Sequence, residues 1–562
     1  MVERPAPRPA GDLFTVVVHW LLVATLLVSL GTGLRIAADD LGSLVGAIGR
    51  RLDGLLPQGA VIGWHVLASW LLLTVGIAYA AFVWRTGQGA RIVPSRGGLR
   101  QLGGALLRPL RRADRQVWFA FNALLFQVAF LLLVLMAATG WMIYRDIHLG
   151  LPARLLTNLH GAGATLLIAY VGLHVLAQFR LDQILKLLRP RPGYAGPAWV
   201  AAGVAVAAIA LAAVLDRSAF SDLRVPQIAT PPTLDGDGGD PAWQAAVPVT
   251  IATLRGANLP DGAVDVEVAA VHDAEHVYLR FRWPDEEASL LHMPLVKRTD
   301  GWELMQTGYE NDDENVWYED KLAVALARSP RLGSGTTHLG RGLSEGAHKP
   351  LNRGLHYSED GAIVDLWHWK AVRTGTMRPG FVDDDHFGPP LPEGKPGARY
   401  TGGYTQDPVE SGGYVLNFTK LEPDQPLGVS PVVPSFLPAD PRVLAATSLA
   451  SREGAVAPLE PVSLAADQVV PYAPELDTYP VGTVMPGVVI KGPFTGDRGD
   501  VLGEATWQDG VWTLEVARRL ETGSPYDVPL RRGEAVYLWV SVFNHTQTRH
   551  SQHLRSIRVV LD

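Results

Sequence analysis

The stretch LHGAGATLLIAYVGLHV, residues 159–175, decides the fold of the first part of the chain, because it places two histidines inside one long apolar run. His160 and His174 lie 14 positions apart. In an α-helix this spacing is about 21 Å of rise and about 1400° of rotation, some 40° short of four whole turns. The two imidazoles are therefore predicted to share one face of a helix, at opposite depths of an apolar layer.

Working outward from this stretch, apolar length predicts five membrane spans. About 20 residues of helix are needed to cross about 30 Å of hydrocarbon. The five runs that meet or approach this length are Leu13–Ile36, Ala60–Trp84, Val117–Tyr144, Leu155–Phe179 and Ala198–Leu215. We expect an all-α transmembrane helix bundle, with a four-helix core that carries the histidines.

The distribution of basic residues predicts the orientation of these spans. The loop 85–116 holds eight arginines against one acidic residue, and the loop 180–191 holds four basic residues against one, whereas the loops 39–53 and 145–154 are nearly balanced in sign. Loops rich in Lys and Arg stay in the cytoplasm. The first run is too long for a signal peptide and lacks a cleavage site. We expect a multi-pass protein of a bacterial inner membrane, with a cytoplasmic N-terminus and a periplasmic C-terminal domain.

Two more histidines lie within the apolar runs, in VVVHWLL (16–22) and IGWHVLASW (62–70). His19 is about six residues from the cytoplasmic end of the first span, and His174 is equally far from the cytoplasmic end of the fourth. His65 lies near the outer start of the second span, level with His160. The expected pairs are therefore His19 with His174 and His65 with His160.

Paired imidazoles at two depths are typical of haem ligation. Neutral imidazole is a good axial ligand for haem iron and suits an apolar site between helices. One intramembrane histidine can equally be a polar residue that hydrogen-bonds across helices. Proton relays and metal transport are further alternatives, but those sites usually contain intramembrane Asp or Glu, which the five spans almost lack. We predict two haems b and electron transfer between the two faces of the bilayer.

The motifs VVVHWLL, IGWHVLASW and LHGAGATLLIAYVGLHV make spans one to four resemble the bacterial cytochrome b561 family, which includes cytochrome b subunits of membrane hydrogenases. The resemblance covers about 200 residues. It implies that His19, His65, His160 and His174 ligate two b haems, and that quinol is oxidised or quinone reduced beside one of them.

Composition limits what else the chain can be. It has 562 residues, a net charge of −7 and no cysteine. The absence of cysteine excludes disulfides, thiolate-bound zinc, iron–sulfur clusters and covalently attached haem. The charge gives no reason to expect nucleic acid as a partner. No molybdenum, flavin or dinucleotide motif is recognised, so we expect the chain to have no substrate-converting centre of its own. Whether the chain is itself an enzyme or an electron-transfer subunit of one stays open.

The second part of the chain is predicted to be an all-β antiparallel sandwich. We divide the chain into a transmembrane domain (1–219), a linker (220–240) and an exported domain (241–562). Period-two alternation predicts strands, with long irregular insertions between about 330 and 480. The predicted strands are VDVEVAAV (264–271), HVYLRFRW (276–283), KLAVALA (321–327), WTLEVARRL (512–520), AVYLWVSVF (535–543) and IRVVLD (557–562).

The segments HVYLRFRWPDEEAS, LHMPLVKRTDGW, VWYEDKLAVAL and IVDLWHWKAVRTG resemble the haem-binding γ subunits of ethylbenzene dehydrogenase and dimethylsulfide dehydrogenase, over residues 230–560. The resemblance implies a third haem b ligated by Met293 and Lys370. A thioether raises a haem potential, and a lysine ligates only as the neutral amine, which requires burial that lowers its pKa. Core filling by the methionine and solvation of the lysine remain open, with Met305 and His368 as the nearest substitutes.

Two acidic strings, ENDDENVWYED (310–320) and VDDDHFG (382–388), are candidates for metal binding. Neither has the ligand spacing of a calcium loop, so solvated turns are the favoured interpretation.

The sequence as a whole predicts a membrane cytochrome. We expect it to pass electrons between the quinone pool, or another membrane donor, and a periplasmic redox protein or catalytic subunit. The alternative is a two-haem membrane anchor that carries a haem-free domain for binding a ligand or carbohydrate.

Overall fold

The computed structural model describes most of the chain. The described residues are 12–37, 43–52, 55–56, 61–87, 97, 100, 115–145, 153–181, 193–217, 221–309, 314–330, 362–388, 404–421, 431–444, 460–553 and 555–562. Residues 310–313 of the first acidic string and most of the loop charges used to predict the orientation lie outside them. The chain divides into two compact units, Met1–Ala219 and Phe220–Asp562.

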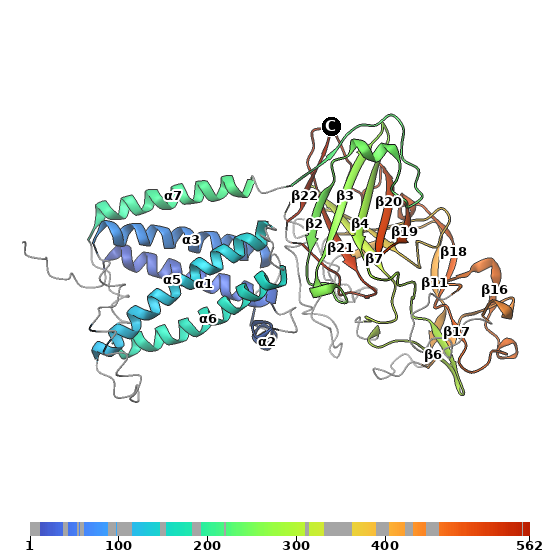
Figure 1. The fold of residues 1–562 in the computed structure, drawn as a ribbon, viewed down its shortest axis with the longest axis horizontal. Coiled ribbons are helices and arrows are strands. Elements are labelled where there is room, and N and C mark those ends of the chain that lie inside the picture. The colour runs from blue at the N-terminus through green and yellow to red at the C-terminus, as the bar shows by residue number, and fades with distance from the viewer. Residues whose placement is uncertain are drawn as a thin grey trace, which may run out of the picture. The chain divides into compact units, whose positions relative to one another are not determined.

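The first unit is helical, as predicted (Figure 1). Its helices are α1 (Leu13–Ala37), α2 (Leu44–Arg51), α3 (Val61–Arg85), α5 (Arg115–Arg145), α6 (Ala153–Arg180) and α7 (Ala195–Arg217). Four of them, α1, α3, α5 and α6, are long and apolar enough to cross a membrane. The fifth predicted span is α7, whose described apolar part, Ala195–Leu211, is shorter.

The helices pack in two tight pairs. α1 lies against α3, and α5 lies against α6, while α7 covers the outer side of α3 and α2 touches both α1 and α6. Many large apolar side chains on these helices remain exposed, for example Leu131 and Phe179. Large exposed apolar side chains on each of α1, α3, α5, α6 and α7 are the surface expected of a bundle solvated by lipid.

The second unit is all-β, and all six predicted strands are present. One sheet has seven strands in the order β1-β22-β21-β7-β8-β9-β10, and a second has five in the order β19-β20-β4-β3-β2. The bounds of the first are β1 Asp222–Val225, β22 Ile557–Leu561, β21 Val536–Phe543, β7 Lys321–Ala327, β8 Val364–Lys370, β9 Asp383–Phe387 and β10 Tyr404–Gln406. Those of the second are β19 Val501–Gln508, β20 Val511–Arg519, β4 His276–Pro284, β3 Val264–His272 and β2 Val249–Thr253.

The two large sheets enclose the main core. Alternate residues of β7, β8 and β21 meet alternate residues of β3, β4 and β20 in one apolar cluster. Its centre is aromatic: the Trp369 ring lies 4.9 Å from that of Trp512 and 6.0 Å from that of Trp283. This is the face-to-face packing of a β-sandwich.

Smaller sheets form a second core beside the sandwich. They are β12-β13-β6-β5-β17, β11-β18-β15 and the pair β14-β16. Their bounds are β5 Leu295–Arg298, β6 Gly301–Leu304, β11 Ser411–Leu416, β12 Phe418–Lys420, β13 Pro431–Pro434, β14 Phe436–Pro438, β15 Leu464–Ala465, β16 Val469–Pro471, β17 Val484–Met485 and β18 Val488–Thr495. The prediction of irregular insertions between about 330 and 480 is therefore wrong for β8 to β16, which all lie within that range.

Two further predictions are corrected by the sheets. The string VDDDHFG forms the buried strand β9 and not a solvated turn, because ion pairs and hydrogen bonds supplied by distant residues satisfy several of its acids. Glu314, Glu319 and Asp320 of the other acidic string are also buried. The linker predicted at 220–240 contains β1, which pairs in parallel with β22 and so belongs to the sandwich.

Candidate functional site

The four intramembrane histidines meet in two pairs. The rings of His19 on α1 and His174 on α6 have centroids 6.4 Å apart, and those of His65 on α3 and His160 on α6 have centroids 6.3 Å apart. The rings pair as the helical spacing predicts. Metal–imidazole bonds are about 2 Å long, so two axial ligands of one metal have ring centroids roughly 6 Å apart once the ring radius of about 1 Å is added on each side.

Hydrogen bonds fix which nitrogen of His65 carries the proton. His65 Nδ1 lies 3.0 Å from the carbonyl oxygen of Ser29 and 3.1 Å from Thr32 Oγ1. A carbonyl can only accept, so Nδ1 carries the proton and donates it. Thr32 in turn donates its hydroxyl proton to the carbonyl of Val28 at 2.7 Å, which leaves its oxygen free to accept from His65. The lone pair of His65 is thereby held on Nε2.

His160 is held in the same way by a different helix. Its Nδ1 lies 2.9 Å from Thr139 Oγ1 on α5, and Thr139 donates its own proton to the carbonyl of Leu135 at 2.8 Å. The threonine oxygen therefore accepts from Nδ1–H, and Nε2 keeps the lone pair. In metal sites, a ligating histidine regularly donates a hydrogen bond from its other ring nitrogen, and this bond fixes its tautomer.

The ring of His174 is held by aromatic contacts. It stacks on Tyr170 with centroids 5.5 Å apart, and Phe126 meets it edge-on at 5.4 Å. Its buried Nδ1 has no hydrogen-bond partner among the described residues. A buried ring nitrogen without a partner is costly, so a further polar group or ordered water beside Nδ1 would stabilise this ring.

Two glycines lie against the pair formed by His65 and His160. A Cβ atom on Gly33 of α1 would lie 3.1 Å from Cε1 of His65, and a Cβ atom on Gly140 of α5 would lie 3.1 Å from Cε1 of His160. Any side chain at these positions would press on a ring. The glycines thus allow two helix backbones to approach the imidazoles closely, as a site for a flat, bulky group requires.

These observations fit haem at both pairs. The donors are facing imidazoles at axial spacing, two of them have their lone pair fixed on Nε2, and the walls are apolar helices. The haem ligands would be His19 with His174, and His65 with His160.

In the β unit, Met293 lies in the second core. It is almost fully buried, with Leu295, Trp302, Tyr318 and Met485 in the same cluster. Its φ is +46°, a left-handed conformation that is uncommon for a long side chain. The backbone N–H of Met293 donates to the carbonyl of Trp317 at 2.8 Å, which helps to hold this conformation.

Lys370 lies at the end of β8 and is buried. Its Nζ forms an ion pair with Asp383 of β9 and donates to the hydroxyl of Tyr414 at 3.1 Å. Burial alone lowers the pKa of Lys370, but the Asp383 carboxylate more than offsets this, so the pKa lies above its usual value. In this arrangement the amine is charged, and it could ligate a metal only after leaving Asp383.

Comparisons with known protein families agree with both halves of this description. Residues 240–555, more than half of the chain, match the family model described as ethylbenzene dehydrogenase. The chain belongs to this family. Residues 11–189 match the family model described as prokaryotic cytochrome b561. The protein is thus a cytochrome b561 membrane domain fused to an ethylbenzene dehydrogenase-family domain, as predicted.

No curated protein matches the chain. Among solved structures, a carbohydrate-binding module of family 9 from Caldicellulosiruptor kristjanssonii in complex with cellotriose is 7% identical, with a TM-score of 0.22, and the match covers 61% of this chain and 94% of that one. A putative carbohydrate-binding protein from Bacteroides uniformis is 8% identical, with a TM-score of 0.24, and the match covers 61% of this chain and 100% of that one. Likeness at this level carries no argument about function.

Sequence reasoning missed a second buried lysine in the ethylbenzene dehydrogenase-family domain. Lys321 on β7 is the cross-strand neighbour of Lys370. Its Nζ lies 3.9 Å from the centroid of the Phe543 ring and donates to the carbonyl of Gln547 at 2.9 Å. Burial, followed by repulsion from Arg373, lowers the pKa of Lys321 well below its usual value. A lysine can ligate a metal only as the neutral amine, which requires a lowered pKa. Lys321 meets this condition, and Lys370, whose pKa is raised by Asp383, does not.

Met293 and Lys370 lie in different clusters that Arg373 connects. The Arg373 guanidinium lies 5.5 Å from the ring of Tyr318, which packs with Met293, and 5.5 Å from the ring of Tyr414, which binds Lys370. The substitutes are held elsewhere: Met305 packs in a separate small cluster, and His368 Nδ1 lies 3.2 Å from Asp385.

Proposed function

We propose that this cytochrome passes electrons between the quinone pool, or another membrane donor, and a periplasmic redox partner through two haems b, one ligated by His19 and His174 and the other by His65 and His160. The observation that carries the proposal is the two facing imidazole pairs, which share helix α6 and are 14 residues apart on it. Membrane location and haem-dependent electron transfer follow from the cytochrome b561 match itself.

The residues of the chain hold the two sites ready. Ser29 and Thr139 keep a proton on Nδ1 of His65 and His160, so no proton has to leave Nε2 before it can ligate. Bound haem iron supplies a one-electron couple at each site. The apolar helices exclude water, so the charge change at each site stays local and no ion has to cross the bilayer.

We further propose that the membrane is a bacterial inner membrane and that residues after 219 lie in the periplasm. The arginine-rich loops 85–116 and 180–191 support a cytoplasmic position for these loops and for the N-terminus. Substrate chemistry would then belong to a separate periplasmic subunit, because the chain carries no recognised motif for another catalytic cofactor.

A third haem, ligated by Met293 and Lys370, is proposed for the exported domain. The family match supports a redox role for this domain, and the left-handed backbone at Met293 supports a functional position, since such strain gathers at ligand sites. Haem would have to displace Asp383 from Lys370. The ion pair between these two residues favours the second candidate function, a haem-free binding domain on a two-haem anchor.

The decisive experiment is a pyridine haemochrome assay on the full-length protein in detergent, together with His160→Ala and His174→Ala. Three haems per chain support the whole proposal, two support the haem-free domain, and none refutes both. We expect His160→Ala to lose the haem between His65 and His160 and keep the other, with the reverse for His174→Ala. Equal loss of both haems in a folded variant would contradict the pairing.

A second experiment assigns the lysine. Lys370→Leu and Lys321→Leu form a matched pair, because the residues are cross-strand neighbours and both are buried. We expect only Lys370→Leu to reduce the count from three haems to two. If only Lys321→Leu lost the third haem, Lys321 and not Lys370 would be the lysine ligand.

A further inference from the structure

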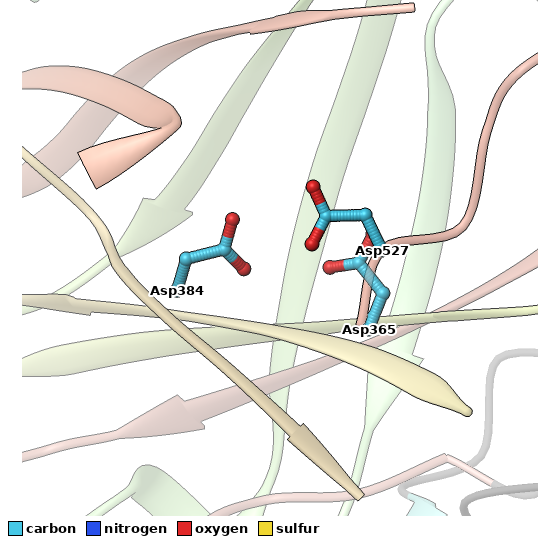
Figure 2. A group of neighbouring side chains, drawn as sticks. All are labelled: Asp365, Asp384 and Asp527. Carbon is cyan, nitrogen blue, oxygen red and sulfur yellow. The ribbon is translucent and has the colours of Figure 1, made fainter. Parts of the chain in front are cut away.

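Three buried aspartates in the sandwich converge on one point. They are Asp365, Asp384 and Asp527, and each offers a carboxylate oxygen that lies within 4.8 Å of the others (Figure 2). Asp365 and Asp384 have no exposed surface, and Asp527 is 8% exposed. This aspartate triad is separate from the four membrane histidines and from Lys370.

The fold assembles the triad from three segments. β8 and β9 run antiparallel, with Trp367 opposite Asp384, so Asp365 lies two residues further along the same face of the sheet. That face points into the sandwich, where Trp367 belongs to the main core. Asp527 comes from the connection between β20 and β21, and the backbone N–H of the next residue, Val528, donates to Asp365 Oδ2 at 3.0 Å.

The nearest cation does not compensate all three charges. Arg518 pairs with Asp365 Oδ2, but its other donors bind the carbonyls of Val528 at 2.6 Å and Arg519 at 3.2 Å. Oδ1 of Asp365 and both oxygens of Asp384 have no hydrogen-bond partner among the described residues. Burying a carboxylate without a partner costs several kcal/mol, so the triad needs either added protons or an added cation.

We propose that the aspartate triad binds a divalent hard cation, Ca²⁺. Carboxylate oxygens are the ligands of Ca²⁺ and Mg²⁺, whereas softer metals prefer nitrogen or sulfur. The three carboxylates offer oxygens that all lie within 4.8 Å of one another, close enough for one ion to contact all three. Mg²⁺ is usually held by only one or two carboxylates, whereas Ca²⁺ accepts several, each with one or two oxygens, so three convergent carboxylates favour Ca²⁺.

The ligand count also fits calcium. Asp384 and Asp527 can each bind with two oxygens, and Asp365 with Oδ1, because Oδ2 is taken by Arg518 and Val528. Five carboxylate oxygens leave one to three positions for water, out of the six to eight that Ca²⁺ takes. The partial exposure of Asp527 gives water a path to these positions. The bound ion would join β8, β9 and the connection from β20 to β21.

Protonation is the rival explanation for the triad. Burial, followed by repulsion from Asp365 and Asp527, raises the pKa of Asp384 well above its usual value when no cation is present. Three acids could then share protons and stay without metal. The two explanations differ in what calcium does to the wild-type protein.

The test uses the full-length protein, stripped with EGTA and returned to calcium-free buffer. Calcium content per chain is measured by mass spectrometry after addition of CaCl₂ and gel filtration, and unfolding is followed by tryptophan fluorescence. We expect one calcium per chain and, at a calcium concentration a hundred times Kd, a rise of roughly 4 °C in the unfolding midpoint of the exported domain. Terbium should also luminesce through Trp367, which lies opposite Asp384.

Asp384→Asn tests the assignment, because it keeps the shape of the side chain and removes one charge. We expect it to lower calcium affinity about tenfold or more. Asp385→Asn is the matched control: the residue is the next one on β9, equally buried, but faces His368 on the other side of the sheet, so calcium binding should persist. Wild-type protein that takes up no calcium overturns the proposal, even if Asp384→Asn fails to fold. Unchanged binding in a folded Asp384→Asn also overturns it.

Discussion

Replacement of Arg518 by methionine should strongly destabilise the β unit, residues 220–562. The guanidinium is fully buried, pairs with Asp365, and lies 5.1 Å from the centroid of the Trp367 ring. It also donates to the carbonyl of Val528 at 2.6 Å. Methionine fills a similar volume, so the change removes the charge and the hydrogen bonds while leaving most of the packing in place.

The magnitude follows from the burial of the pair. Removing one partner of a buried ion pair costs about 3–5 kcal/mol, because the other charge is left without compensation. The unit Phe220–Asp562 has about 340 residues, and an unfolding entropy of about 2.1 cal/mol/K per residue gives roughly 0.7 kcal/mol/K. The unfolding midpoint should therefore fall by about 4–7 °C.

Differential scanning calorimetry of the full-length protein in EGTA measures this fall without a contribution from calcium. Arg531→Met is the control, because Arg531 pairs with Glu521 on the surface, where both side chains are about half exposed, and should leave the midpoint unchanged. A fall of less than about 1 °C for Arg518→Met would refute the reasoning, since it would mean that Asp365 loses nothing when its buried partner is removed.

Three further outcomes test other contacts. Thr139→Val should weaken haem retention at the site of His65 and His160 by about 10–100-fold in an apomyoglobin capture assay. Thr165→Val is the control, because it loses only a hydrogen bond to its own helix and should leave haem retention unchanged. Gly140→Leu should press on the ring of His160 and alter the low-spin electron paramagnetic resonance signal of one haem only; two unchanged signals would count against the close approach. His292 should add a pH dependence to unfolding. Burial lowers the pKa of His292 to about 4, so the unfolded state binds one more proton than the folded state between about pH 6.5 and 4. The stability of the folded state therefore falls as the pH drops through this window. His292→Gln should flatten that part of a plot of unfolding midpoint against pH.

Helix geometry explains why so much of the membrane site could be predicted. A fixed rise and rotation per residue determine both the depth and the face of each histidine, so two pairs follow from four positions. The hydrogen-bond partners of these histidines could not be predicted in the same way. Whether Ser29 or Thr139 reaches an imidazole depends on how neighbouring helices are rotated and spaced, and the sequence of one helix does not contain that information.

In the β unit, the alternation of apolar and polar residues predicted the strands but not the buried charges. A run of three aspartates is usually solvated, so β9 was predicted to be a turn. Asp383 is buried because Lys370 and Arg498, residues far away in sequence, both pair with it. Lys321 was missed for a similar reason: its low pKa comes from Arg373 and from burial beneath Phe543, and neither contact is local.

The parallel pairing of β1 with β22 has a consequence for how the β unit folds during synthesis. Asp222 and Arg558, 336 positions apart, form an ion pair across this contact, with 2.7 Å between Oδ2 and Nη2. The chain must therefore be synthesised as far as residue 561 before β22 can complete its pairing in the large sheet. Until then the edge of β21 has unpaired backbone groups that invite pairing with other chains. A domain whose large sheet is completed by so late a contact is exposed to aggregation for the whole time of its synthesis, and chaperones would be needed most during that interval.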